Sequence, residues 1–355
     1  MKQIRTRTPV RIDLAGGTVD IWPLYLLIPR ATTLNLAIDL YAEVTLKHGP
    51  KPEKKGDPEV ILRSGDQSAE MVFSWKELFT RDAPPALILH QRLLRHFAER
   101  HPKKRPKYLV LETRATSPAG AGLGGSSSIN IALTGALASL FLGRAAVKSE
   151  SSRTSLIEIA RDIETQILGV PAGLQDYYGA MFGGLQELSW GVQTHGRKNL
   201  KPKLLKELSS RLLLFYSGQS RNSGINNWQL FKSMIEKDRA LAQRFATINS
   251  ATHGLREALL KSDWTEAMHA INREWQARRE LAPGISTPEI DRALEKAKRE
   301  TEVGFKICGA GGGGCFFIYL PKPDAAVKER IIQQLGDDGI RNLPFNAAAK
   351  GLDIR

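Results

Sequence analysis

A run of glycines and serines near the middle of the chain leads directly into an apolar segment. The run spans residues 118–128 and reads Pro-Ala-Gly-Ala-Gly-Leu-Gly-Gly-Ser-Ser-Ser, and the apolar segment spans residues 129–142. Glycines allow positive φ and close approach to an anion, and the free N–H groups at a helix start point toward phosphate oxygens. The serine hydroxyls add donors and a ligand for Mg²⁺. The pattern predicts a phosphate-binding loop before a buried helix; a flexible loop with a serine N-cap is the alternative.

The glycine spacing also fits a dinucleotide-binding fingerprint, but its context does not. Gly120, Gly122 and Gly125 satisfy that motif, which normally opens a first strand–helix unit and is followed by an acidic residue about 20 positions later. Here the loop lies mid-chain, and Gly143 and Arg144 occupy the region where the acid belongs. No Lys-Ser or Lys-Thr pair closes the loop, so the Walker pattern fails as well. The serine cluster favours a nucleoside triphosphate with a metal ion over a nicotinamide cofactor.

The composition is that of a globular protein with an ample core. The 355 residues are 42% hydrophobic and 25% charged, which fits one large domain or two and excludes a disordered chain or a collagen-like fibre. The formal net charge of +14 suits an anionic partner without identifying it. The basic segments 48–58 and 100–107 lack the interleaved aromatic residues of a single-strand nucleic-acid groove. We therefore expect no nucleic-acid partner.

Cysteine usage and hydropathy indicate a cytoplasmic protein. Cys308 and Cys315 are the only cysteines and give neither a disulfide framework nor a zinc spacing, so we expect two buried thiols in a reducing compartment. Residues 1–7 run into a strand pattern without the apolar core of a signal peptide. No apolar run approaches the roughly 20 residues needed to cross a bilayer, so we expect no membrane partner.

Strand and helix patterns mix along the whole chain. Apolar and polar residues alternate over residues 10–14 and 34–46, which predicts strands, the first of them half-buried. Residues 212–216, 305–308 and 315–320 are further strand candidates, the last two flanking a run of glycines. This mixture predicts an α+β or α/β class with two lobes, divided in the lysine-rich stretch around residues 191–209.

One carboxylate lies on the apolar face of a predicted helix over residues 156–168. Ile157, Ala160 and Leu168 share that face with Glu164. Burial of Glu164 next to a cation would explain its position, and a carboxylate that reaches water at the edge of the face is the alternative.

Three segments are similar, in order, to the three motifs of the GHMP kinases, the family of galactokinase, homoserine kinase, mevalonate kinase and phosphomevalonate kinase. Residues 8–20 resemble the first motif, residues 118–128 the second and residues 306–315 the third. Residues 164–176 resemble the family's stretch from its metal-ligand Glu to its catalytic Asp. The resemblance covers nearly the whole chain, and three matched motifs are far more specific than one.

The resemblance implies a two-lobed α+β fold. An ATP-binding N-terminal domain, residues 1–205, would contain a left-handed βαβ unit, against the usual hand. A ferredoxin-like C-terminal domain, residues 206–355, would close the cleft and present the third motif. ATP and Mg²⁺ would be the cofactors, and the reaction would be phosphoryl transfer to an alcohol group.

The resemblance also implies roles for individual residues. Asp176 would face the acceptor hydroxyl as general base, and Arg11 would orient it and hold negative charge, although a nearby arginine also weakens a base. Glu164 and Ser126 would hold Mg²⁺, with Ser127 as the alternative because Gly125 stands where many relatives have serine. The residues expected to bind the nucleotide are Pro118, Gly120, Gly122, Leu123, Gly124, Gly125, Ser126, Ser127, Ser128, Gly311 and Gly312.

The first motif narrows the class of acceptor substrate that the resemblance implies. Its Ala-Gly-Gly-x-x-Asp form resembles the bacterial heptose 7-phosphate kinases and the fucokinases rather than the galactokinases. Asp20 and Gly17 would contact sugar hydroxyls, Trp22 would stack on a sugar face, and Arg221 would pair with an acceptor phosphate. A turn residue for Asp20 and a surface arginine for Arg221 are the plainer interpretations.

We therefore expect an ATP-dependent small-molecule kinase acting on a sugar or sugar phosphate, with a homodimer as a candidate assembly. The apolar continuation Ile21-Trp22-Pro23 keeps open a less polar acceptor such as mevalonate or a cyclitol. A catalytically silent ligand-binding relative is the remaining alternative.

Overall fold

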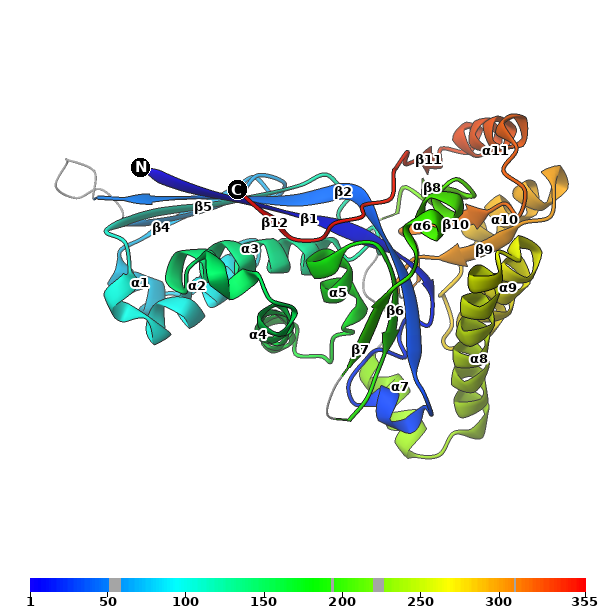
Figure 1. Cartoon of the computed structure of the whole chain (residues 1–355), viewed down its shortest axis with the longest axis horizontal. Coiled ribbons are helices and arrows are strands. Elements are labelled where there is room, and N and C mark those ends of the chain that lie inside the picture. Colours follow the sequence, from blue (N-terminus) through cyan, green and yellow to red (C-terminus); the bar gives the residue numbers. More distant parts are fainter. Residues whose placement is uncertain (51–58, 193–194, 220–226, 310) are drawn as a thin grey trace.

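The computed structural model describes residues 1–50, 59–192, 195–219, 227–309 and 311–355, which form two sheets with their helices (Figure 1). Helices α1–α5 lie along one face of the larger sheet, and α8 and α9 stand at the other end of the molecule (Figure 1). This arrangement confirms the predicted α+β class with two lobes.

The larger sheet contains eight strands in the order β12-β1-β2-β5-β3-β4, with β6 paired to β2 and β7 paired to β6. All its pairs are antiparallel except β3 with β5. The long strand β2 pairs with β5 near its end and with β6 near its start, so one strand serves two parts of the sheet. The bounds are β1 Lys2–Ala15, β2 Thr32–Gly49, β3 Val60–Ser64, β4 Ala69–Phe73, β5 Tyr108–Ala115, β6 Leu185–Ser189, β7 Gly196–Asn199 and β12 Asp353–Ile354.

The helices of the first lobe pack around α3. It contacts β1, β2, α2, α4 and α5, and its residues are buried on most sides, as its continuous apolar sequence predicts. The bounds are α1 Trp75–Thr80, α2 Ile88–Arg100, α3 Gly125–Phe141, α4 Glu150–Leu168 and α5 Gln175–Phe182, with short 3₁₀ turns η1 Leu24–Leu27, η2 Pro102–Lys104 and η3 Arg144–Val147.

The smaller sheet has four antiparallel strands in the order β11-β8-β10-β9. Its bounds are β8 Leu212–Tyr216, β9 Gly304–Ile307, β10 Cys315–Tyr319 and β11 Arg341–Asn342. The associated helices are α6 Pro202–Ser209, α7 Asn227–Ile235, α8 Arg239–Lys261, α9 Trp264–Arg279, α10 Pro288–Glu300 and α11 Ala325–Asp337. β7 of the larger sheet ends at Asn199, and the final strand β12 returns to pair with β1. The domain limits at residue 205 stay a prediction.

The end of β1 is buried on both faces, which differs from the half-buried strand that its alternation predicts. α3 and α5 contact β1, and so do α8 and α9 of the second lobe. Arg11 and Asp13, the polar members of the alternation, are therefore 4% and 0% exposed. Two charged side chains in a strand that is covered on both faces need partners. They find these partners in the candidate active site.

Cys308 and Cys315 are buried free thiols, as predicted. Burial raises the pKa of the Cys308 thiol to about 12, which keeps it protonated and unreactive. Among the described residues, no helix combines the length and the apolar character that crossing a bilayer requires.

Candidate active site

The glycine–serine loop leads into the start of α3 without a side-chain cap. Gly124 is the N-cap residue at φ +75°, and Gly120 and Gly122 also have positive φ. The first N–H groups of a helix have no partner within the helix, so those of α3 can donate to a ligand. This uncapped glycine start fits the phosphate groups of a nucleotide.

Asp176 lies directly against this loop. A Cβ atom added to Gly124 would come within 3.1 Å of the Asp176 carboxylate, which is tighter than an ordinary contact, and the φ of +75° favours glycine as well. Asp176 is in the first turn of α5, and its side chain is 23% exposed. The loop and the acidic residue therefore share one site, although 48 or more residues separate them along the chain.

Arg11 connects three parts of this site. From β1, its Nε donates to Asp176 Oδ1 at 2.7 Å and its Nη1 donates to the Gly122 carbonyl at 2.7 Å. Burial opposes the charge of the guanidinium, but Asp176 and Asp13 outweigh burial and raise the pKa of Arg11. Arg11 thus stays charged and fixes both the carboxylate and the loop.

Glu164 of α4 is buried next to the start of α3, and a cation beside it stays a prediction. Ser126 Oγ donates to its Oε1 at 2.6 Å, while Asn130 and Tyr177 donate to its Oε2 at 3.0 and 2.7 Å. Burial and the Glu164 carboxylate raise the pKa of Tyr177, so its hydroxyl remains a donor. A carboxylate oxygen next to a hydroxyl is the oxygen donor set that Mg²⁺ prefers, and the residues present therefore fit this ion.

The three serines of the loop are not equivalent. Ser126 contacts Glu164, which favours it over Ser127 as the metal-ligating serine. Ser128 uses both polar groups inside the protein: its Oγ donates to the Pro9 carbonyl at 2.9 Å and its N–H donates to the Gly124 carbonyl at 2.9 Å. We therefore leave Ser128 out of the proposed nucleotide site. Its helical position turns it toward β1 instead of the loop.

The glycine run of the third motif lies against the phosphate loop. The Cys315 N–H donates to the Ala121 carbonyl at 2.7 Å, and a Cβ atom on Gly314 would come within 2.8 Å of that oxygen. Gly311 and Gly312 pack instead on the segment around Ile285, whose carbonyl accepts the Gly312 N–H at 2.9 Å. The contact between the two motifs is made by Gly314 and Cys315, and a nucleotide contact of Gly311 and Gly312 stays a prediction.

The predicted acceptor residues fall into three groups. Asp20 is buried, accepts the N–H of Gln175 at 2.9 Å, and has its pKa raised to about 7 by burial and by the nearby charges of Asp176 and Asp13. Gly17 is buried against Asp13 and Gln175, and Trp22 is 57% exposed. Arg221 lies outside the described residues.

Sequence reasoning missed a buried ionic cluster next to these residues. Lys306 of β9 pairs with Asp13 at 2.8 Å, and Arg278 pairs with Glu274 at 2.6 Å on α9. The side chain of Gln175, the residue before Asp176, is also buried, and its Oε1 has no hydrogen-bond partner among the residues that the structure describes. The alternation of β1 did not indicate this cluster, because it predicts a strand with Asp13 on the solvent side.

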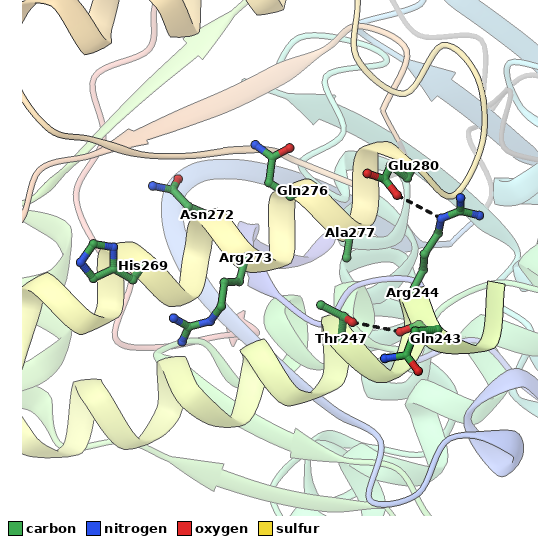
Figure 2. Close-up of a pocket in the computed structure, with 9 residues that line it drawn as sticks. All are labelled: Gln243, Arg244, Thr247, His269, Asn272, Arg273, Gln276, Ala277 and Glu280. Carbon is green, nitrogen blue, oxygen red and sulfur yellow. Dashed lines mark hydrogen bonds and ion pairs between the residues drawn. The ribbon is translucent and has the colours of Figure 1, made fainter. Parts of the chain in front are cut away.

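A separate groove lies between α8 and α9 (Figure 2). It has a volume of about 610 Å³, and its arginines are engaged by carboxylates, Arg244 by Glu280 and Arg273 by Glu266. None of the predicted site residues that the structure describes lines this groove. It is therefore distinct from the site built around Asp176.

Family models match both lobes. The model for the N-terminal domain of GHMP kinases matches residues 89–184, and the model for their C-terminal domain matches residues 255–338, together just over half of the chain.

Curated relatives extend the match to nearly the full length. A D-glycero-α-D-manno-heptose 7-phosphate kinase from Campylobacter jejuni is 28% identical, with 94% of each chain covered. The L-fucokinase/L-fucose-1-P guanylyltransferase of Bacteroides fragilis is 30% identical over 92% of this chain, which spans only 35% of that bifunctional protein.

Solved structures show the same fold. A putative sugar kinase from Campylobacter jejuni has a TM-score of 0.75 at 24% identity, covering 100% of this chain and 98% of that one. A heptose phosphate kinase from Bacteroides thetaiotaomicron has a TM-score of 0.74 at 21% identity, covering 99% and 98%. With its two matched domains, its fold and its three motifs in order, the chain belongs to the GHMP kinases, phosphotransferases that act on an alcohol group.

Proposed function

We propose that the protein transfers the γ-phosphate of ATP, with Mg²⁺, to a hydroxyl of a sugar or sugar phosphate. The observation that carries this proposal is the position of Asp176 against Gly124, with Arg11 bonded to both the carboxylate and the loop. A phosphate-binding loop and an acidic group thus meet at one point, as in-line transfer to an alcohol requires.

Each side chain of the site would have a separate role in the reaction. ATP with Mg²⁺ would supply the transferable phosphoryl group and neutralise part of its charge. The start of α3 would bind the phosphates, and Ser126 with Glu164 would hold the metal ion. Asp176 would accept the hydroxyl proton, and Arg11 would keep that carboxylate aimed at the acceptor and stabilise negative charge at the site. These four side chains are all present and bond in two pairs, Ser126 with Glu164 and Arg11 with Asp176, so a catalytically silent relative is disfavoured.

The relatives support a carbohydrate acceptor. The C. jejuni relative is named a heptose 7-phosphate kinase and the B. fragilis relative an L-fucokinase. A mevalonate kinase from Arabidopsis thaliana is a weaker match at 23% identity. Asp20 beside Asp176 offers a carboxyl group that can accept two sugar hydroxyls. The cytoplasmic location and the homodimer stay predictions.

The direct test is ATP turnover with a panel of acceptors. D-glycero-D-manno-heptose 7-phosphate, L-fucose and mevalonate would each be incubated with ATP and Mg²⁺, and products identified by ³¹P NMR. We expect phosphorylation of a carbohydrate, lost in Asp176→Asn and retained in the control Asp162→Asn, which changes an exposed carboxylate on α4. Phosphorylation of mevalonate alone, or turnover that survives Asp176→Asn, would contradict the proposal.

A further inference from the structure

Four buried charged side chains lie beneath the loop that follows β1. Lys306 Nζ is 2.8 Å from Asp13 Oδ2 and 3.8 Å from Glu274 Oε1, and Arg278 Nη2 is 2.6 Å from Glu274 Oε1. All four side chains are at most 1% exposed. Two positive and two negative charges balance, and the cluster joins β1 of the first lobe to β9 and α9 of the second.

This cluster also bonds directly to the loop. Arg278 Nη2 donates to the Gly17 carbonyl at 2.8 Å and its Nη1 donates to Thr18 Oγ1 at 3.2 Å. Glu274 Oε1 accepts the N–H of Gly16 at 3.2 Å. Three consecutive loop residues are thus held by two side chains of α9, from the other lobe.

The loop needs such support because its backbone is strained. Thr18 has φ +66°, a left-handed conformation that costs a β-branched residue energy and persists only when the surroundings impose it. Gly17 cannot be larger, since a Cβ atom there would lie 2.1 Å from Asp13 Oδ2. The ionic cluster therefore shapes the segment that leads into Asp20.

Asp20 ends this segment and is tied to the catalytic helix. Its Oδ2 accepts the N–H of Gln175, the residue before Asp176. A shift of the loop would move the Asp20 carboxyl relative to Asp176, and an error of about 1 Å is enough to impair positioning.

We propose that Glu274 and Arg278 are positioning residues for the acceptor, which hold residues 16–20 so that Asp20 stands beside Asp176. This inference depends on the proposed function only in that Asp20 contacts the acceptor. Buried ion pairs contribute little net stability compared with apolar replacements, so geometry is what this pair supplies. Neither residue touches the substrate; both act through the loop.

The test separates loop geometry from stability with three variants. Arg278→Met removes the donors to Gly17 and Thr18 and leaves Glu274 without its nearest cation. Glu274→Gln/Arg278→Met also removes that buried charge, so thermal stability should recover relative to the single variant. The control Arg153→Met removes an α4 arginine that donates to three backbone carbonyls of the first lobe, including that of Val147, and does not contact the loop.

Two measurements are made on each variant. Hydrogen exchange of the peptide covering residues 14–22 should quicken about tenfold or more in both Arg278 variants, because the loop loses its fixed partners. The KM for the acceptor found with wild type should rise about tenfold or more, with the KM for ATP and kcat within about twofold, because a displaced loop weakens acceptor binding and leaves the nucleotide site unchanged. Arg153→Met should change neither.

The outcomes distinguish this inference from the proposed function. If the double variant regains wild-type exchange and acceptor KM together with its stability, the pair has a merely structural role and the inference is wrong. If wild type phosphorylates no acceptor of the panel, the proposed function fails, but exchange of residues 14–22 still decides whether α9 holds the loop. Unchanged exchange in Arg278→Met would overturn the inference in either case.

Discussion

Replacing Asp20 by asparagine should stabilise the protein at alkaline pH. Asp20 has its pKa raised to about 7 by burial and by the charges of Asp176 and Asp13, against an ordinary value of 3.8. Each pKa unit corresponds to about 1.4 kcal/mol, so ionising Asp20 in the folded protein costs about 4 kcal/mol. Asparagine carries no such cost, and its carbonyl oxygen can still accept the Gln175 N–H.

The direction in which stability changes with pH follows from the raised pKa of Asp20. A carboxyl group with a raised pKa favours the folded state below about pH 4, and this contribution is lost as pH rises through about 7. The free energy of unfolding of Asp20→Asn minus that of wild type should therefore grow by about 2–3 kcal/mol between about pH 5 and pH 8.5. Urea unfolding at a series of pH values measures this growth, and any pH-independent effect of the substitution cancels.

The control Asp162→Asn makes the same change at an exposed ion pair on α4, where the difference should stay within about 1 kcal/mol over the whole range. A difference for Asp20→Asn that does not change with pH would refute the reasoning, because Asp20 would then ionise equally easily in the folded and unfolded chains. Asp20→Asn should also bind the acceptor more weakly, so the substitution that stabilises the protein at alkaline pH should lower its activity.

Three further predictions concern the catalytic centre. Asp176→Asn should lower kcat by about 10²–10⁴-fold with ATP binding retained, measured by steady-state kinetics and nucleotide titration. Glu164→Gln should raise the Mg²⁺ concentration needed for half-maximal rate, measured by metal titration, because the carboxylate beside Ser126 loses its charge. Gly124→Ala should reduce kcat/KM by at least about tenfold and destabilise the fold by about 1–2 kcal/mol, since its φ is +75° and the added Cβ would meet Asp176; kinetics and urea unfolding check both.

The sequence was most informative where local chemistry dictates local structure. The glycines and serines of residues 118–128 could be interpreted as a helix start for phosphate because each step depends on neighbouring residues. Composition could not show which serine faces Glu164, the proposed metal ligand. That depends on the helix rotation, which turns Ser126 to Glu164 and Ser128 to the Pro9 carbonyl.

The hydrophobic periodicity of the sequence could not predict which charged side chains are buried. Alternation on β1 assigns Arg11 and Asp13 to the solvent side, but the second lobe covers that side and buries both. Likewise, Glu274 and Arg278 are spaced as an exposed i,i+4 ion pair, yet they are fully buried. Leu168 is the reverse case: the apolar stripe includes it, but it is the last residue of α4 and is 56% exposed.

The charges around the site indicate which kind of acceptor molecule it can bind. Arg11 pairs with Asp176, Lys306 with Asp13 and Arg278 with Glu274, whereas no ion pair reaches Asp20 within the part of the chain that the structure describes. An acceptor carboxylate placed against Asp20 would add a second buried negative charge without a cation, at a cost of several kcal/mol. Sugar hydroxyls instead donate hydrogen bonds to this carboxyl group without adding a charge. Asp20 therefore favours a neutral polyol face over a carboxylate acceptor such as mevalonate, and any phosphate of the acceptor must bind elsewhere.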